Sequence, residues 1–497
     1  MPRTYRLIIT VLRFITRLYF RRVEVSGLEH VPTEGGGVLV AWHPNGLVDP
    51  GLILTQFPRQ VIFGARHGLF GVPVLGQLMK SIGTVPIYRV QDASDDDSAS
   101  RQTANRGSLD ALVAEVARGS FSCLFPEGTS HDSPHPLEIK TGAARLYYLA
   151  RKQASADQVP PVIIPVGLHY DKKRLFRSRA LVQFHPPMPI PAHLDVAPPA
   201  DEDTQTRRAR YRALTDEIDR ALHETAHATE TWELHHLMRR TRKLVRAERA
   251  VDSGRGRSKP DMKELTLGFS RVRHAYNQRL VERPEHVAEI TERVREYDAN
   301  LRALKLDDDD LDASPRVAPP LLVLSLIGQV IAVYLLVPPL LALGFLVNAP
   351  GIVAVLALTK TVSKYKKDEA TVKLLAGALV FPVLWLIAGA VVWYLHHRLN
   401  LMFPQLPDVP WMSALAVILL AALGGFLALR YTEISRETAR ALRIRFTRFN
   451  QRETLKQLRG DRRQIFDDMM ALAEGLDLPG QVDEAGRLSP NLPGATL

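Results

Sequence analysis

The chain has 497 residues, a hydrophobic content of 46%, a single cysteine and a formal net charge of +11. This length allows two or three domains, and the lone Cys123 excludes an intrachain disulfide and any cysteine metal cluster. The positive charge flanks apolar segments rather than forming an aromatic-laced face, so we expect membrane lipids and phosphate-bearing substrates as partners, and no nucleic acid.

The first predicted element is a helix over residues 5–20, within an N-terminal region 1–21. Its apolar side chains share one broad face: Leu7, Ile8, Val11, Leu12, Ile15, Leu18 and Tyr19. Arg6, Arg13 and Arg17 interrupt this stretch, which also lacks a small-residue cleavage site, so neither a simple membrane span nor a secretory signal fits. We expect an amphipathic helix in the headgroup zone, with packing on the protein's own core as the alternative.

Short apolar strands alternate with helical stretches from residue 22 to about residue 190. The candidate strands are 36–42, 61–63, 85–88, 122–125, 162–168 and 180–184, and the candidate helices are 108–116 and 141–151. This alternation predicts an α/β domain over 22–200, with a mostly parallel sheet and flanking helices. In such sheets, ligands gather beyond the carboxyl ends of the strands.

Two short motifs in this region carry candidate chemistry. In the run HPNGLVD, Asp49 can hold the His43 imidazole in one tautomer and stabilise its charged form, which suits a general base near neutral pH. The run FPEGTS at 125–130 is a tight turn with a carboxylate and two hydroxyls, in which Gly128 lets the backbone approach a ligand closely. Each motif follows a predicted strand, so we expect both at one edge of the sheet.

These motifs resemble motifs I and III of the PlsC-like glycerolipid acyltransferases, the family of glycerol-3-phosphate and lysophosphatidate acyltransferases. Two further segments fall in the family's order: GTVPIYR at 83–89 resembles motif II, and VIIPVG at 162–167 resembles the apolar motif IV. The lead-in FRRVEVSGLE at 20–29 is also similar to the family's first strand. The resemblance covers about residues 15–190 and implies a PlsC-like acyltransferase domain.

The spacing of the first motif departs from the common family pattern. Five residues separate His43 from Asp49, where the family usually has four. The HPNGLVD form resembles the subset that contains fungal-type glycerol-3-phosphate and dihydroxyacetone-phosphate acyltransferases, which also carry a C-terminal membrane region. The extra residue leaves the geometry of the pair open.

The resemblance implies roles for individual residues. His43 is the expected general base and Asp49 its partner, moving a fatty acyl group directly from acyl-CoA or acyl-carrier protein to an acceptor hydroxyl. Arg89 is expected to bind the acceptor's phosphate, and Pro165 to border the acyl chain or thioester. The expected substrate-binding residues are Asn45, Arg89, Glu127, Gly128, Thr129, Ser130 and Pro165. His67, His131, Lys140 and His169 are expected to be structural or peripheral, and no metal or other cofactor is expected.

Beyond residue 200 the composition changes twice. Residues 201–318 are rich in Glu, Arg, Ala and His and predict charged helices with solvated faces. Residues 319–430 predict a membrane region, with an apolar run at 320–358 too long for one span and two spans at 374–395 and 412–429. We expect 320–358 to form a hairpin that bends near Pro338 or Asn348. Residues 431–497 predict a basic cytoplasmic tail, loose after Asp477.

Loop charge predicts the sidedness of the membrane region. Lysines cluster between 360 and 373, and arginines follow the last span between 430 and 448. The positive-inside rule places both clusters in the cytoplasm. A hairpin at 320–358 then makes the number of crossings even, so the catalytic domain of this integral membrane protein faces the cytoplasm, at the inner membrane if the source is bacterial.

We therefore expect a membrane-bound acyltransferase of phospholipid biosynthesis that acylates glycerol 3-phosphate. Lysophosphatidate or another lysophospholipid is the alternative acceptor. A lipid transporter or flippase with a tethered acyltransferase-like domain is the alternative from another class, although the spans carry few charges for a transport path. A scaffold with an inactive enzyme fold is a third possibility, against which the intact His43, Asp49, Glu127 and Gly128 count.

Overall fold

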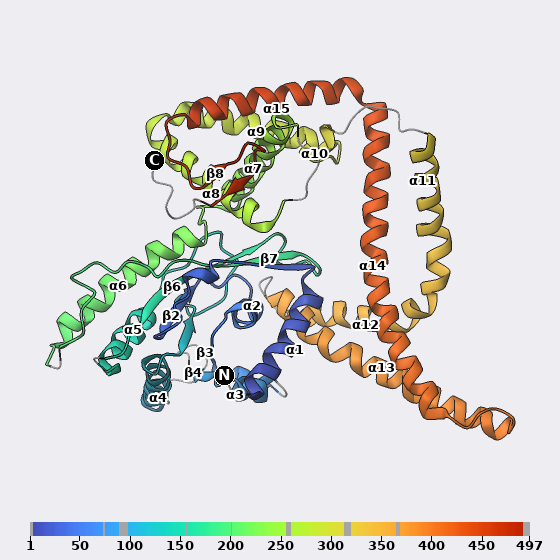
Figure 1. Ribbon diagram of the computed structural model, residues 1–497, viewed down its shortest axis with the longest axis horizontal. Coiled ribbons are helices and arrows are strands. Elements are labelled where there is room, and N and C mark those ends of the chain that lie inside the picture. The colour runs from blue at the N-terminus through green and yellow to red at the C-terminus, as the bar shows by residue number, and fades with distance from the viewer. Residues whose placement is uncertain are drawn as a thin grey trace. The chain divides into compact units, whose positions relative to one another are not determined.

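The computed structural model describes residues 3–72, 75–88, 98–155, 157–199, 201–254, 260–312, 320–363 and 368–490 (Figure 1). The chain forms two compact units. The first comprises Met1–His236, Pro260–Arg273 and Tyr365–Thr371, and the second comprises Leu237–Lys259, His274–Lys364 and Val372–Leu497. Each unit has its own hydrophobic core.

A seven-stranded sheet forms the centre of the first unit. Its strands are β1 (Arg22–Ser26), β2 (Gly37–Ala41), β3 (Val61–Arg66), β4 (Val85–Ile87), β5 (Phe121–Leu124), β6 (Val162–Tyr170) and β7 (Arg179–Phe184). They lie in the order β1-β7-β6-β2-β5-β3-β4, and every neighbouring pair is parallel except β6 and β7. The mostly parallel sheet confirms the predicted fold class.

Helices cover both faces of this sheet (Figure 1). The helical elements up to residue 225 are α1 (Arg3–Tyr19), η1 (Leu28–His30), α2 (Val48–Gln56), η2 (His67–Gly71), α3 (Leu75–Ser81), α4 (Ser98–Ala117), α5 (Gly142–Gln153) and α6 (Thr204–Thr225). Side chains of α4, α5 and α6 form one buried cluster with Val38, Val40 and Ile163 of the sheet. The sequence placed α6 in a separate charged region, but Leu214 and Leu222 belong to this cluster, so the helix is part of the α/β unit.

Helix α1 has one face packed on the protein and a second apolar face that is exposed. Tyr5 and Ile9 are buried against the first unit, and the Arg13 Nε donates to the Thr55 carbonyl of α2 at 2.7 Å. Leu7, Val11 and Phe14 form an apolar stripe, one or two turns apart, that stays exposed: Leu7 and Phe14 are 65% and 67% accessible. One face therefore packs on the protein, and the interfacial role of the other stays a prediction.

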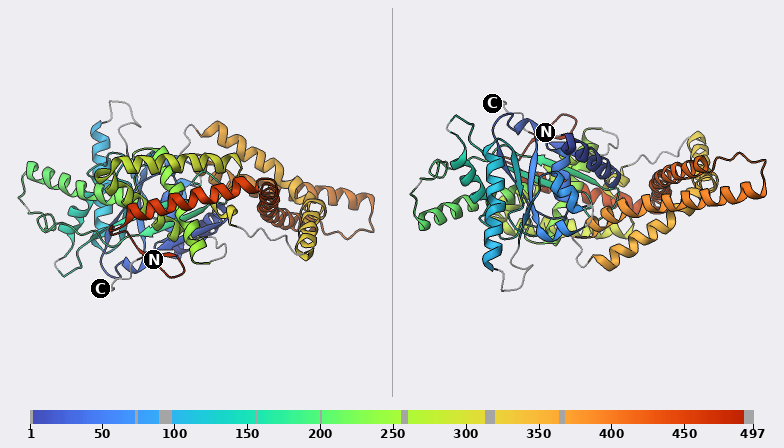
Figure 2. Two further views of the ribbon diagram at one scale, coloured as in Figure 1. Left: turned by 90° about the horizontal axis from the view of Figure 1, so that it is seen from above. Right: turned by 90° about the horizontal axis from the view of Figure 1, so that it is seen from below.

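The second unit joins charged helices that are far apart in sequence. These are α7 (Trp232–Asp252), α8 (Met262–Glu282), α9 (Pro284–Ala303), α10 (Asp308–Leu311) and α15 (Arg452–Ala473), the first turns of α7 and the first half of α8 belonging to the first unit. Apolar side chains of α7, α9 and α15 share one core, and α15 lies along α9 (Figures 1 and 2). The predicted charged region and tail thus form one bundle. Where a loose end was expected, β8 (Gln481–Val482) pairs with β9 (Leu488–Ser489).

A buried ion network fastens α15 to this bundle. Arg462 is 1% exposed; it donates through Nε to Glu248, through Nη2 to Asp312 at 2.7 Å, and through Nη1 to the Asp308 carbonyl at 3.0 Å. The Asp308 carboxylate in turn accepts from Arg240 at 2.6 Å and from the Tyr297 hydroxyl at 2.9 Å. Every charged group of this network is therefore paired, as burial requires.

The apolar helices of the second unit are α11 (Pro320–Ile331), α12 (Val337–Val362), α13 (Glu369–Met402) and α14 (Pro410–Asn450). Within the described residues, three segments are long and apolar enough to cross a membrane: Gly344–Val362 of α12, and α13 and α14. The chain turns between α11 and α12 through a π-helical segment, Ala332–Leu336, next to the predicted bend at Pro338 (Figure 1). Asn348, the other candidate bend, lies inside α12.

Asn348 ties the three long helices together. Its amide nitrogen donates to the Gly344 carbonyl at 2.8 Å and to the Ala421 carbonyl of α14 at 2.9 Å, and its oxygen accepts from the Trp385 indole of α13 at 2.9 Å. A Cβ on Gly344 would lie 2.9 Å from the Gly424 Cα, so glycine is required where α12 crosses α14. Small residues and a satisfied polar side chain are typical of packing between membrane helices.

Candidate active site

The two chemical motifs meet at the carboxyl edge of the sheet. β2 ends two residues before His43, and β5 ends just before the 125–130 turn. These strands are parallel neighbours, with Val40 opposite Leu124. Because parallel strands end at the same edge, the sheet itself brings together motifs that are about eighty residues apart.

His43 and Asp49 form the predicted pair despite the five-residue spacing. The His43 Nδ1 lies 2.8 Å from the Asp49 Oδ2. A carboxylate only accepts hydrogen bonds, so Nδ1 carries the proton and the lone pair of Nε2 is left to act as a base. The imidazole also stacks on the Phe125 ring, with centroids 4.0 Å apart and planes 15° apart. The fold therefore fixes both the orientation and the tautomer of His43 that a general base requires.

Asp49 is fully buried and has three donors. It lies in the first turn of α2 and accepts from His43, from the Asn45 backbone N–H at 2.7 Å, and from the Tyr170 hydroxyl. Burial and the neighbouring Asp49 charge raise the pKa of Tyr170 well above its usual value, which keeps the hydroxyl protonated as a donor. The sequence did not single out Tyr170; the available signal was a polar residue at the end of the motif IV strand.

Glu127 positions the histidine from the other motif. Its Oε2 accepts from the His43 backbone N–H at 2.9 Å, and its Oε1 accepts from the Leu137 N–H at 3.0 Å. His131 donates its Nε2 proton to Oε1 at 2.7 Å, since its Nδ1 accepts from the Ser133 N–H at 3.1 Å. The His131 N–H also donates to the His43 carbonyl at 3.0 Å. The buried Glu127 thus holds the base in place, while its predicted contact with substrate stays a prediction.

The rest of the 125–130 turn places small and polar groups beside a cation. Gly128 has φ +70° and its N–H donates to the Phe125 carbonyl at 2.9 Å. A Cβ there would lie 3.0 Å from the Lys140 ammonium, so glycine leaves room for this exposed lysine. Thr129 donates to the Ser130 carbonyl at 3.3 Å. Lys140, expected to be peripheral, therefore lies directly on the motif.

The loop after β6 supports the first motif. The Asn45 amide donates to the Lys173 carbonyl at 3.3 Å, and the Lys173 ammonium lies 3.5 Å from the Pro44 carbonyl. The same ammonium pairs with Asp132, and its distance to the centre of the Trp232 ring is 5.3 Å. The Asn45 side chain is thus used in positioning this loop, and its predicted substrate contact is not tested.

Thr371 contacts the motif from far along the chain. Its hydroxyl accepts from the Leu47 N–H at 3.0 Å and faces Gly46, where φ is +48°. Thr371 lies in the first turn of α13 and belongs to the first unit. No local pattern in the sequence indicates this contact, because it depends on a return of the chain after more than three hundred residues.

Pro165 lies within the sheet, inside the strand predicted over 162–168. It is buried in β6 opposite Val40 of β2, and its carbonyl accepts from the His185 N–H at 3.0 Å. The antiparallel pairing of β6 with β7 begins only at Val166, so the missing N–H of Pro165 leaves no gap in that ladder. Motif IV is thus a buried central strand, and the proposed role of Pro165 at the acyl chain stays a prediction.

Arg89 falls outside the described residues, but the strand that leads to it is fixed. β4 ends at Ile87, and the Asn105 side chain of α4 both accepts from the Tyr88 N–H at 2.9 Å and donates to its carbonyl at 2.8 Å. The His67 ring stacks on Tyr88 at 4.3 Å. β4 lies three strand positions from β2, about 14 Å at the usual strand spacing.

His169, predicted to be structural or peripheral, is surrounded by other histidines. His169 precedes Tyr170 in β6, and burial together with the neighbouring His185 and His235 lowers its pKa to about 3. Its ring lies 4.9 Å from that of His227. A histidine that stays neutral at physiological pH inside a buried cluster fits the structural role expected for it.

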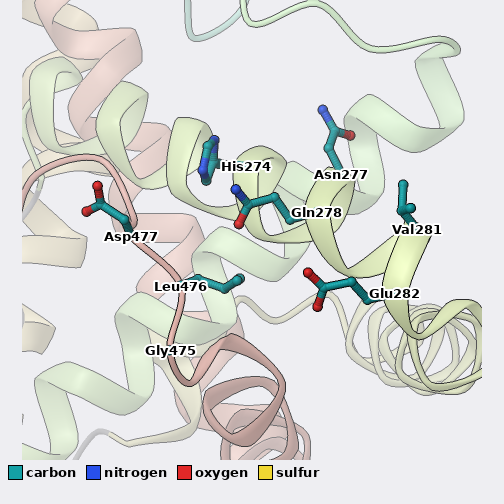
Figure 3. Close-up of a pocket in the computed structure, with 8 residues that line it drawn as sticks. All are labelled: His274, Asn277, Gln278, Val281, Glu282, Gly475, Leu476 and Asp477. Carbon is teal, nitrogen blue, oxygen red and sulfur yellow. The ribbon is translucent and has the colours of Figure 1, made fainter.

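A separate hollow of about 670 Å³ lies in the second unit (Figure 3). It is lined by His274, Asn277, Gln278, Val281, Glu282, Gly475, Leu476 and Asp477. Arg279 holds one wall by donating to the carbonyls of Leu472 and Glu474, both at 2.6 Å. None of its lining residues that the structure describes form a base and acid pair comparable to His43 and Asp49, and we assign the chemistry to the sheet edge.

Replacing Tyr170 with phenylalanine tests the third donor to Asp49. We expect kcat to fall about tenfold with little change in KM, since one hydrogen bond to a buried charge is lost while the ring is retained. Steady-state kinetics with thermal unfolding measures both effects. Tyr148→Phe is the matched control, because that hydroxyl donates to the Leu194 carbonyl at 2.8 Å away from the dyad. Equal loss in both variants would show a general packing effect.

Comparison with known proteins agrees with this geometry. Residues 22–169 match the family described as acyltransferase, and residues 270–477 match the glycerol-3-phosphate acyltransferase 2 C-terminal domain. Glycerol-3-phosphate O-acyltransferase 1 of Saccharomyces cerevisiae is 25% identical over 305 residues, which cover 58% of this chain and 37% of that protein. A chloroplastic 1-acyl-sn-glycerol-3-phosphate acyltransferase of Brassica napus is 25% identical over 124 residues, 25% of this chain and 33% of that one.

Among solved structures, the 1-acyl-sn-glycerophosphate acyltransferase PlsC of Thermotoga maritima is 17% identical, with a TM-score of 0.29, and the match covers 44% of this chain and 79% of that one. The chain spans between a third and two fifths of the length of the yeast and Brassica relatives named above. The segment that matches the acyltransferase family, residues 22–169, lies in the α/β domain, and the segment 270–477 covers most of the helical part. Residues 22–169 thus match an acyltransferase domain, and residues 270–477 match the C-terminal domain of glycerol-3-phosphate acyltransferase 2.

Proposed function

We propose that this protein transfers a fatty acyl group from acyl-CoA or acyl-carrier protein to a hydroxyl of glycerol 3-phosphate, with His43 as the general base. The observation that carries the proposal is the His43–Asp49 pair at 2.8 Å, fixed by Tyr170 and Glu127 at the carboxyl edge of the sheet. The family of the α/β domain supports acyl transfer, and the match of residues 270–477 supports glycerol 3-phosphate as the acceptor.

The proposed reaction needs no covalent intermediate on the protein. The Nε2 of His43 takes the proton of the acceptor hydroxyl while that oxygen attacks the thioester carbonyl, and a carbon–oxygen bond forms. When the tetrahedral intermediate collapses, the carbon–sulfur bond breaks and the leaving thiolate takes the proton from His43. Asp49 stabilises the imidazolium between these two transfers. The only cysteine, Cys123, is fully buried in β5 and takes no part.

A panel of acceptors tests the choice of substrate. Full-length protein is incubated with one labelled acyl-CoA and with glycerol 3-phosphate, dihydroxyacetone phosphate or 1-acylglycerol 3-phosphate, and the products are separated by chromatography. We expect the highest kcat/KM with glycerol 3-phosphate. A clear preference for 1-acylglycerol 3-phosphate, as the name of the Brassica relative suggests, would assign the second acylation instead.

Arg89→Ala tests phosphate binding. We expect the acceptor's apparent KM to rise about ten- to a hundredfold, because a charge-assisted pair with phosphate contributes about 1.5–3 kcal/mol. The KM of the acyl donor should change little. Arg118→Ala, an exposed arginine paired with Glu115, is the matched control. If only the KM of the acyl donor changed, Arg89 would bind the CoA part of the donor and not the acceptor's phosphate.

The membrane helices support a proposed topology with the α/β domain in the cytoplasm. The Gln329 amide donates to the Thr438 hydroxyl of α14, the Tyr334 hydroxyl to the Ser435 carbonyl, and the Asn348 amide to the Ala421 carbonyl. The contacts move back along α14 as the segment advances, so residues 329–348 run antiparallel to α14. Beyond Asn348, α12 meets α13 where Gly351 approaches Phe381. The segment 320–362 thus first follows α14 and then follows α13. This path is consistent with a re-entrant segment that begins and ends on the same side of the membrane.

Cysteine labelling measures this topology. In a Cys123→Ala background, single cysteines are introduced by Tyr365→Cys and Phe403→Cys. We expect a membrane-impermeant thiol reagent to reach position 365 from the cytoplasm and position 403 from the opposite side, because both basic clusters favour the cytoplasm. The reverse pattern would mean that 320–358 crosses once, and the sidedness of everything after it would change.

A further inference from the structure

A basic hollow of about 330 Å³ lies where α14 leaves its apolar segment. It is lined by Lys305, Leu306, Asp307, Arg436, Ala439, Arg440 and Arg443, all within the second unit. The three arginines are spaced by four and three residues, so they share one face of α14. Lys305 faces them from the end of α9.

The charges in this basic hollow are only partly compensated. Asp307 is paired with Arg440 at 2.5 Å and with Lys243 at 3.3 Å, and Arg440 also reaches Asp310 at 3.2 Å. No described residue forms an ion pair with Lys305, Arg436 or Arg443. Three cations therefore face a hollow whose single carboxylate is already neutralised. Guanidinium groups in such a cluster suit the oxygens of a phosphate.

The backbone places Lys305 at some conformational cost. Lys305 has φ +55°, and the Leu306 N–H donates to the Leu301 carbonyl at 3.1 Å to close the C-terminal turn of α9. Glycine is the usual residue at this position of such a turn. A lysine held in this conformation points to a use for its ammonium group.

Helix α11 packs on α14 at the same height as the basic hollow, but on the opposite face of α14. The Gln329 side chain of α11 donates to the Thr438 hydroxyl at 3.1 Å, two residues from Arg436 and Arg440. Arg436 lies seven residues beyond Leu429, the end of the apolar segment, which is about 10 Å along the helix axis. This is within reach of the headgroup layer, given the length of an arginine side chain.

We propose that the basic hollow binds the phosphate of an anionic lipid, with a phosphate monoester such as phosphatidate as the preferred headgroup. Three unpaired cations favour the dianion of a monoester over the single charge of a diester. The position of the arginines, which begin about 10 Å beyond the apolar segment of α14, favours a lipid headgroup over a free phosphate. This site is distinct from the sheet edge and does not depend on the proposed acyl transfer.

Native mass spectrometry of the full-length protein in neutral detergent tests the site. All proteins carry Arg89→Ala, so that the proposed acceptor site contributes little, and the ligands are phosphatidate, phosphatidylcholine and glycerol 3-phosphate. We expect phosphatidate to bind, and Arg436→Gln with Arg443→Gln to weaken it at least about tenfold. The control variant Arg445→Gln with Lys456→Gln removes the same charge outside the basic hollow and should bind as before.

Three results would overturn the assignment. Equal weakening in both double variants would mean diffuse surface attraction and no built site. Equal binding of phosphatidylcholine would remove the role of the phosphate monoester. Equal or tighter binding of glycerol 3-phosphate at the same arginines would make the ligand a free phosphate ester and not a lipid. Arg440 is left unchanged throughout, because its pairs with Asp307 and Asp310 belong to the fold.

Discussion

Replacing His43 with alanine is expected to lower kcat by about 10²- to 10⁴-fold while the protein stays folded and membrane-bound. This is the usual contribution of a positioned general base. Asp49→Asn should be similarly severe, because Nδ1 would lose the acceptor that fixes its tautomer; in serine proteases the same change costs on the order of 10⁴. The measurement is transfer of labelled acyl groups to glycerol 3-phosphate under saturating conditions, with thermal unfolding to show that the fold is kept.

The control for this experiment is another histidine of the same unit. His223 lies on α6 and bonds to the Asp219 carbonyl at 3.0 Å, and its side chain is 40% exposed. His223→Ala should leave kcat within about twofold, since surface changes of this kind have small effects. Near-normal turnover in His43→Ala would remove the base from the mechanism, whatever the result for Asp49.

Arg462→Leu should produce the largest loss of stability. The substitution removes three hydrogen bonds and leaves the Glu248 carboxylate, with a side chain only 4% exposed, without its closest cation. Breaking a buried ion pair by removing one partner typically costs about 3–5 kcal/mol, because the remaining charge is desolvated and unpaired. Denaturant or thermal unfolding of the detergent-solubilised chain measures the change in free energy of unfolding.

The neighbouring residue provides the comparison. Arg463 pairs with Asp252 and Asp467, but its side chain is 48% exposed. Arg463→Leu should cost at most about 1 kcal/mol, because water screens exposed pairs. If both substitutions had the same effect, burial would not be what makes Arg462 important, and the network would be an ordinary surface contact.

The sheet and the dyad could be predicted because both depend on local signals. Apolar runs such as the one around Val162–Leu168 report buried strands directly, and parallel strands that end at one edge bring His43 and the 125–130 turn together. The extra residue between His43 and Asp49 did not disturb the pair, because Asp49 enters the first turn of α2 and the loop before it absorbs the difference.

The site residues that the sequence did not predict depend on contacts that no local sequence pattern indicates. Tyr170 reaches Asp49 because β6 lies next to β2, an order that the sequence does not state. Thr371 reaches Leu47 from the first turn of α13. Likewise, α7 and α9 were expected to be charged helices with solvated faces, and α15 to lie in a basic tail. Only their mutual packing, with Arg462 paired inside, makes them one core.

Direct transfer at the dyad is tested most directly by following one labelled acyl group. Purified protein is mixed with labelled acyl-CoA, with and without glycerol 3-phosphate, and both the lipid products and the denatured protein are scored for label. The mechanism predicts label in 1-acylglycerol 3-phosphate only when glycerol 3-phosphate is present, no label covalently bound to the protein, and transfer by His43→Ala lowered by about 10²- to 10⁴-fold. Label retained on the protein, or undiminished transfer by His43→Ala, would contradict it.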